Sequence, residues 1–211
     1  FISSNFKLKG GEDIIETFEK LRRFGLNNVK LTIITPIDSL DDKTMKRIDG
    51  NGNVELFDFK FDRQQLIEIY KNSNVLLNPT RQDSFPLVIL EAMKAGNVII
   101  STDLYAIKEM VEDRFNGFLI EPRYRFFRED NMPNEHVWNN RDETIYSNYT
   151  DERVINFMFE KICYLEENRT VLREMSLNSY NKANKGEFSE VVISSKWEEK
   201  LLRSGGWNDI R

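Results

Sequence analysis

Residues 78–91 of the chain are NPTRQDSFPLVILE, which combine the end of a strand, a polar turn and the start of a helix. An apolar stretch at residues 74–77 leads into the turn, and the helix is expected to open at Pro86. One carboxylate, Asp83, lies in the turn, and a second, Glu91, lies eight residues later on the helix. Open α/β sheets bind ligands at the carboxyl ends of strands, where helix N-termini offer free N–H groups to anions. The stretch therefore predicts a binding site at the end of this strand.

The residue types in the stretch suit a nucleotide sugar. Free amides of Ser84, Phe85 and Leu87 would point out of the helix start toward a diphosphate. Glu91 lies roughly 7 Å further along the helix, at about 1.5 Å per residue, which is comparable to the length of a diphosphate. Carboxylates accept hydrogen bonds from sugar hydroxyls. Spacing alone leaves an alternative open, in which Asp83 caps the helix and Glu91 is a solvated surface residue.

Around this stretch, strand-like and helix-like segments alternate from the first residue to about position 122. Strands are expected at 1–4, 29–35, 54–59, 74–77, 98–101 and 117–120, and helices at 12–24, 41–48, 62–70, 86–95 and 106–111. Residues 29–35 are almost continuously apolar, as expected for a strand covered on both sides. The alternation predicts an α/β fold with a Rossmann-like parallel sheet and helices on both faces.

Residues 123–150 break the alternation. The segment is polar and carries six aromatic residues: Tyr124, Phe126, Phe127, Trp138, Tyr146 and Tyr149. We interpret it as an inserted loop or flap, because such a length is unusual for a connection inside a compact domain. Its aromatic side chains either contact an acceptor or a membrane surface, or pack on one another. Helices are expected to follow at 151–166, 170–183 and 189–203, the last with Ser189 as its cap.

The composition excludes several classes of protein. The 211 residues include 40% hydrophobic and 31% charged residues, which is a globular rather than a disordered composition. A net charge of −5 argues against nucleic acid as the main partner. No apolar run approaches the roughly 20 residues that span a bilayer. The single Cys163 excludes an internal disulfide and fits a reducing cytosol. We expect a cytoplasmic protein, located in the cytosol or at the inner face of the membrane, and because the chain starts inside an apparent strand, we expect it to be a fragment.

Residues 74–103 resemble the C-terminal domain of retaining GT-B glycosyltransferases, and in particular the group 1 (family four) branch. That family carries a Glu-x7-Glu pair, which this chain matches with Asp83-x7-Glu91. The resemblance extends over nearly the whole chain and is interrupted by the aromatic insertion. Its further elements are Lys9-Gly10, residues 54–57 (VELF), 107–111 (IKEMV), 116–122 (NGFLIEP) and 187–189 (EFS).

The resemblance implies a role for each matching residue. Glu91 would hold the ribose hydroxyls of the donor nucleotide, and Asp83 would lie beside the transferred sugar. Lys9 would contact the phosphates and stabilise the departing nucleoside diphosphate. Asp83 and Lys9 are thus the candidate catalytic residues. The backbone amides near the donor sugar and diphosphate would be those of Ser84, Phe85, Leu87 and Val88.

The chain also departs from the family pattern. Ser3-Ser4 stands where relatives carry Gly-Arg, so Ser4 occupies the donor-contacting position of a missing phosphate-binding cation. We expect Arg81 or Lys7 to replace that charge; the alternative for both is a solvated surface cation. Asp83 is one methylene shorter than the usual Glu. Ser84 replaces a Gly, Tyr105-Ala106 replaces a Gly-Gly pair, and Lys108 replaces a Pro.

The function implied is that of the donor-binding half of a glycosyltransferase, with residues 1–211 as one nucleotide-sugar-binding domain. The whole enzyme would move a sugar, with retention, from a UDP- or GDP-linked donor to a hydroxyl acceptor in polysaccharide or glycolipid synthesis. The acceptor, a glycan or lipid-linked glycan, would bind mainly to a preceding N-terminal domain, so this chain alone would bind nucleotide without turnover. The family resemblance implies no cofactor and no metal.

Other functions stay open. The lost glycines, the missing cation and the shortened Asp83 would also fit a non-catalytic nucleotide-binding or scaffold domain derived from the same fold. A sugar-nucleotide epimerase shares the fold but fits the spaced acids less well. A dehydrogenase is disfavoured because no Gly-x-Gly-x-x-Gly follows a strand. His136, the only histidine, has no partner ligands for a metal, and Cys163 lies among apolar residues that predict a core position.

Overall fold

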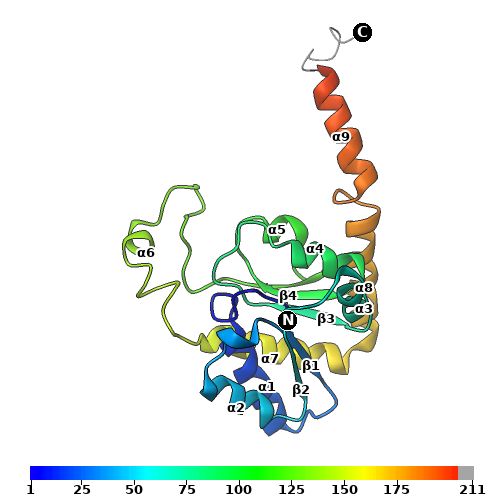
Figure 1. The fold of residues 1–211 in the computed structure, drawn as a ribbon. Helices are drawn as coiled ribbons and strands as arrows, with labels where there is room; N and C mark the ends of the chain where they lie inside the picture. Colours follow the sequence, from blue (N-terminus) through cyan, green and yellow to red (C-terminus); the bar gives the residue numbers. More distant parts are fainter. Residues whose placement is uncertain (204–211) are drawn as a thin grey trace.

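In the computed structural model, which describes residues 1–203, five strands form two parallel sheets (Figure 1). The smaller sheet pairs β1 (Leu31–Ile34) with β2 (Val54–Phe57). In the larger sheet, β4 (Val98–Thr102) lies between β3 (Val75–Asn78) and β5 (Gly117–Ile120). The expected α/β architecture with parallel strands is confirmed.

The expected strand at residues 1–4 is reduced to one bridge, between Ile2 and Ile34 of β1. The chain bends after this bridge, at Ser4, where the Ser3 hydroxyl accepts the Asn5 amide at 2.9 Å. A cavity of about 380 Å³, whose lining includes Phe1, Thr32 and Val75, lies between the two sheets. The strands therefore form two sheets, separated by this cavity, where the sequence predicted one.

Helices cover both faces of the sheets, as predicted. All five residues of β4 are buried. Ile100 belongs to one apolar cluster with α1 and α7, whereas its neighbour Ile99 belongs to a second cluster with α4 and α5. The helix α8 contributes to both clusters. These elements are α1 (Gly11–Phe24), α4 (Leu87–Lys94), α5 (Ile107–Met110), α7 (Glu152–Glu167) and α8 (Arg169–Asn184).

The remaining helices lie nearer the periphery. They are α2 (Asp42–Asp49), α3 (Arg63–Lys71), α6 (Glu135–Asn139), α9 (Glu190–Arg203) and the short 3-10 turn η1 (Ile37–Ser39). The Ser189 hydroxyl accepts the Val192 amide at 3.4 Å, so the predicted cap of α9 is confirmed. Figure 1 shows α9 extending away from the sheets, and none of its residues is buried. Within residues 1–203, no helix has the length and apolar character needed to cross a membrane.

The inserted segment, residues 123–150, is folded rather than an open loop. It contains α6 and a small core of Phe126, Val137 and Ile145. The rings of Phe126 and Trp138 pack edge to face with centroids 5.5 Å apart. The aromatic residues therefore pack on one another, as one of the two interpretations expected, and contact with an acceptor or a membrane stays a prediction. Figure 1 shows the segment looping out to one side of the sheets.

Candidate functional site

The loop that carries Lys9 packs directly against the turn that follows β3. Gly10 has a φ of +75°, and a Cβ atom added there would lie 2.3 Å from the Pro79 carbonyl oxygen. Glycine is needed at this position for both reasons, because other residues rarely adopt this φ and no side chain fits the contact. The Arg81 amide also donates to the Leu8 carbonyl at 3.0 Å, so the two segments are joined through their backbones.

This packing brings together the two candidate catalytic residues, which are 74 positions apart in the sequence. The Lys9 ammonium forms an ion pair with the Asp83 carboxylate, and each side chain is 21% exposed. The ammonium also donates to the Gln82 carbonyl at 2.8 Å. Because a lysine ammonium has three N–H donors, one remains for an oxygen of a ligand at the end of β3.

The start of α4 differs in detail from the sequence interpretation. The helix begins at Leu87, and Pro86 precedes it without a side-chain cap, so Asp83 is not the helix cap. The second oxygen of Asp83 accepts a hydrogen bond of 3.3 Å from the Phe85 amide. This amide was expected to be free, and it is not. Ser84 is exposed. By helix geometry the first amides of α4, on Leu87 and Val88, have no partner inside the helix and form the positive end of its dipole.

Glu91 lies on an exposed face of α4, yet its carboxylate has a buried partner. The Tyr70 hydroxyl donates to Glu91 Oε2 at 2.9 Å, and Tyr70 is 4% exposed. Burial, and then the Glu91 charge, raise the pKa of Tyr70. Both residues line a cavity of about 440 Å³ between α3 and α4, together with Leu66, Leu87 and Leu90. The sequence pattern does not single out Tyr70, and the one signal that it offers is the position of Tyr70 at the end of an expected helix, just before a buried strand.

Arg81 does not face solvent at this edge. Its side chain is 6% exposed, and its guanidinium donates to the carbonyls of Ser147, at 3.1 Å, and Tyr149. It also lies 3.4 Å from the Asp13 carboxylate and 3.9 Å from the centroid of the Tyr149 ring. The guanidinium is therefore bound by the inserted segment and α1. These contacts argue against the alternative in which Arg81 is a solvated surface cation. They also occupy the guanidinium that was expected to bind a diphosphate.

Of the other residues proposed to contact phosphate, Ser4 and Lys7 are exposed. Lys7 lies 3.7 Å from Asp41, and its side chain is 46% exposed. The replacement of the missing cation stays a prediction, and Lys7 is the residue of the two candidates whose charge remains accessible.

The loop after β4 shows what replaces the missing glycine pair. Tyr105 has a φ of 45°, a left-handed conformation that is uncommon for a residue with a side chain. Its hydroxyl accepts the Phe126 amide at 3.2 Å, and its ring packs edge to face on Phe127. The inserted segment therefore stabilises a left-handed backbone conformation at Tyr105, where the family pattern has glycine.

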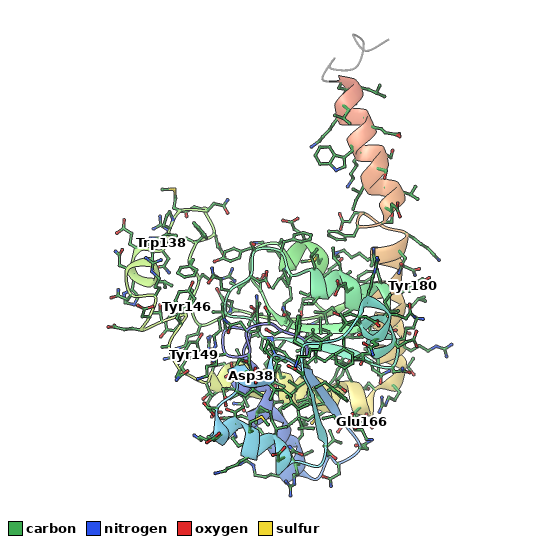
Figure 2. All side chains as sticks on the ribbon, viewed as in Figure 1. Asp38, Trp138, Tyr146, Tyr149, Glu166 and Tyr180 are labelled. Atoms are coloured by element: carbon green, nitrogen blue, oxygen red, sulfur yellow. The ribbon has the colours of Figure 1, made fainter. Side chains whose placement is uncertain are left out.

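The inserted segment contacts the loops at the carboxyl ends of several strands. Besides Tyr105 after β4, it contacts Gln82 after β3, because the Tyr146 hydroxyl donates to Gln82 Oε1 at 3.0 Å. Leu8, in the loop after Ile2, packs on its core. Figure 2 shows Trp138 in the outer part of the segment and Tyr149 closer to the sheets. The segment therefore borders the turn that holds Lys9 and Asp83.

Comparisons with known proteins agree with this architecture. A family model described as "Glycosyl transferases group 1" matches residues 1–126. A capsular polysaccharide biosynthesis glycosyltransferase, CapM of Staphylococcus aureus, is 28% identical over 124 residues, covering 57% of this chain and 32% of that protein. The N-acetyl-alpha-D-glucosaminyl L-malate synthase of Bacillus anthracis is 24% identical over 174 residues, covering 76% of this chain and 44% of that protein.

Solved structures show the same fold. The pneumococcal O-GlcNAc transferase GtfA, crystallised with UDP and GlcNAc, superposes with a TM-score of 0.67 at 21% identity. The match covers 96% of this chain and 35% of that one. The matches thus cover between 32% and 44% of the length of these three proteins. The GT-B architecture implied by the sequence is confirmed.

Proposed function

The chain belongs to the group 1 glycosyltransferases, and we propose that it is the donor-binding half of an enzyme that transfers a sugar from a nucleoside diphosphate to a hydroxyl acceptor. The observation that carries the proposal is the contact between Lys9 and Asp83 beside the open start of α4. It places a cation, a carboxylate and unpaired helix amides at the carboxyl end of β3, where α/β sheets bind ligands.

Each part of the site has a defined task in this proposal. The third N–H of Lys9 and the first amides of α4 bind the diphosphate and stabilise the charge that develops as it leaves. Asp83 forms an ion pair with Lys9 and accepts hydrogen bonds from hydroxyls of the donor sugar. Glu91, at the cavity between α3 and α4, accepts the ribose hydroxyls. The bond from the anomeric carbon to the phosphate oxygen breaks, a bond to the acceptor oxygen forms on the same face, and the proton of the acceptor hydroxyl passes to the departing diphosphate.

The substrate classes follow from the same reasoning. UDP is the first donor nucleotide to examine, because the pneumococcal transferase of this fold was crystallised with it. Polysaccharide or glycolipid assembly in the cytoplasm or at the inner face of the membrane is the pathway class that we propose, in line with the capsular relative. The acceptor would bind mainly to a separate N-terminal domain.

Nucleotide affinity tests the proposal. In calorimetric titrations with UDP, GDP and ADP, we expect one nucleotide to bind this chain with a submillimolar Kd. Glu91→Gln should weaken that affinity about tenfold or more, because it removes a charged acceptor of two hydroxyl hydrogen bonds. The matched control is Glu160→Gln on the exposed surface of α7, which should bind as the parent does.

The alternative function is a non-catalytic domain that has kept the fold. The exposed Ser4 and the occupied guanidinium of Arg81 favour it, because neither residue supplies a second cation for the phosphates. Absent or millimolar binding of all three nucleotides by the parent chain would support the scaffold. Unchanged affinity in Glu91→Gln would remove the assignment of the ribose site.

A further inference from the structure

Tyr70 is held in a fixed position at the end of α3. Its ring belongs to the buried cluster that includes Ile89 and Met93 of α4. Its backbone carbonyl accepts a hydrogen bond of 2.8 Å from the side chain of Asn97, which is 1% exposed. Ring and backbone are thus both constrained, so the phenolic oxygen has a defined place at the base of the cavity between α3 and α4.

Glu91, in contrast, extends from an exposed helix face and depends on Tyr70 for its orientation. Three cations line the same cavity, Arg63, Lys71 and Lys94, but no ion pair joins them to Glu91 among the described residues. The Tyr70 hydroxyl donates to Oε2 at 2.9 Å and leaves Oε1 for a ligand. The carboxylate is therefore oriented before any ligand arrives.

We propose that Tyr70 is a positioning residue that orients the Glu91 carboxylate and thereby sets the preference of the site for ribose over deoxyribose in the donor nucleotide. The inference rests on the proposed function, in which Glu91 binds the ribose hydroxyls. It adds a residue and a measurable selectivity that Glu91 by itself does not explain.

Two physical effects support this role. An unrestrained exposed glutamate loses rotamer freedom when it binds, and a hydrogen bond already made in the free protein reduces that loss. The raised pKa of Tyr70, caused first by burial and then by Glu91, keeps the hydroxyl protonated, so it acts as a donor throughout the neutral range. The cavity of about 440 Å³ has room for a small-molecule ligand against its apolar wall.

A purely structural role makes a different prediction. Buried tyrosine hydroxyls usually find a hydrogen-bond partner, and Glu91 could serve only that need. In that case Tyr70→Phe would change the stability of the fold but not the discrimination between nucleotides. Selectivity therefore separates the two roles, whereas stability does not.

The experiment compares a ribonucleoside diphosphate with its 2′,3′-dideoxy analogue by calorimetry on the full chain, using whichever of UDP, GDP or ADP binds the parent. We expect Tyr70→Phe to weaken the ribonucleotide about three- to tenfold while leaving the dideoxy analogue unchanged, so that the ratio of the two affinities falls. Tyr180→Phe, at an exposed tyrosine of α8, is the matched control and should keep the parental ratio.

Each outcome decides between the claims. A parental ratio in Tyr70→Phe, with the ratio abolished in Glu91→Gln, overturns the role of Tyr70 and leaves the proposed function intact. A parental ratio in both variants, or no binding by the parent chain, overturns the role of Tyr70 together with the ribose site. A reduced ratio in Tyr70→Phe at unchanged dideoxy affinity supports the inference.

Discussion

Two regions meet at the carboxyl ends of the strands, and they are specified in different ways. The turn at 79–86 and the start of α4 can be recognised from adjacent residues in the sequence, although the turn also packs on the backbone of Leu8 and Gly10. The inserted segment 123–150 is instead held by single contacts to residues far away in the sequence. Arg81 reaches Ser147 and Tyr149, and directly after the segment the Asp151 amide donates to Asp13 at 2.8 Å.

The candidate site therefore depends partly on residues outside the stretch 78–91 that identifies it. Arg81 lies inside the signature stretch, yet its side chain points to the insertion and α1 rather than to the site. Tyr105 replaces a glycine of the family pattern and is supported by the insertion. The departure at Tyr105 is therefore matched by contacts that the insertion adds, which gives it a structural explanation.

The largest expected effect is on the anchor of the inserted segment. Arg81→Met leaves Asp13 without a countercharge, although its side chain is only 3% exposed, and leaves two carbonyls without their donor. Removing one partner of a buried ion pair costs about 3–5 kcal/mol. We expect a loss of that size in the free energy of unfolding, measured by urea denaturation.

The control for this prediction lies in the same segment. Arg128 pairs with Asp130 at 3.2 Å, but both side chains are more than half exposed, at 59% and 58%. Arg128→Met should therefore cost at most about 1 kcal/mol. Equal effects of the two substitutions would show that the insertion is not anchored through Arg81.

The second prediction concerns the pH dependence of the same anchor. Burial raises the pKa of Asp13 from 3.8 to about 6, although Arg81 opposes the shift. Below about pH 4 the carboxyl is protonated in both states and its full contribution to stability is present. As the pH rises toward 6 the unfolded chain releases the proton first, so stability falls, by about 3 kcal/mol for two pKa units at about 1.4 kcal/mol each.

Denaturation of the parent and of Asp13→Asn at pH values from 4 to 7 measures this effect. The stability of the parent relative to the variant should fall as the pH rises, because the amide does not titrate. Asp41→Asn provides a control with a flat difference in this range, since hydrogen bonds from Thr44 lower the pKa of Asp41 and its contribution changes only below about pH 4. A flat difference for Asp13 would mean that its carboxyl keeps an ordinary pKa in the folded chain.

The sequence was sufficient for the parts of the fold that depend on local patterns. The run at 98–101 alternates between the two apolar clusters, and the apolar face at 12–24 packs on the sheets, because periodicity determines which face is buried. The expected strand at 1–4 was wrong in extent. Its apolar residues suit a strand, but the bend at Ser4 ends the pairing, and a hydrogen bond from a backbone amide to one side chain is not visible in a pattern.

The candidate site could be predicted only in part, for a related reason. The family pattern identified Lys9, Asp83 and Glu91, and the structure brings the first two into contact. Nothing in the pattern indicated that Phe85 donates its amide to Asp83 or that Tyr70 contacts Glu91. The first depends on the exact backbone conformation of the turn, and the second on side chains from two different helices, and spacing along the chain encodes neither.

The smallest expected effect tests the local side of the comparison. Asp62 begins α3 with a reciprocal pair of hydrogen bonds: its carboxylate accepts the Gln65 amide and the Gln65 side chain accepts the Asp62 amide, both at 2.9 Å. Asp62→Ala removes one of these and should cost about 1 kcal/mol in unfolding free energy. Asn134 caps α6 in the inserted segment through a longer contact, 3.5 Å to the Val137 amide, so Asn134→Ala should cost less.

If Asp62→Ala instead destabilised the chain as strongly as Arg81→Met, α3 would also depend on long-range coupling. The contrast between a locally encoded core and an insertion held from a distance would then fail.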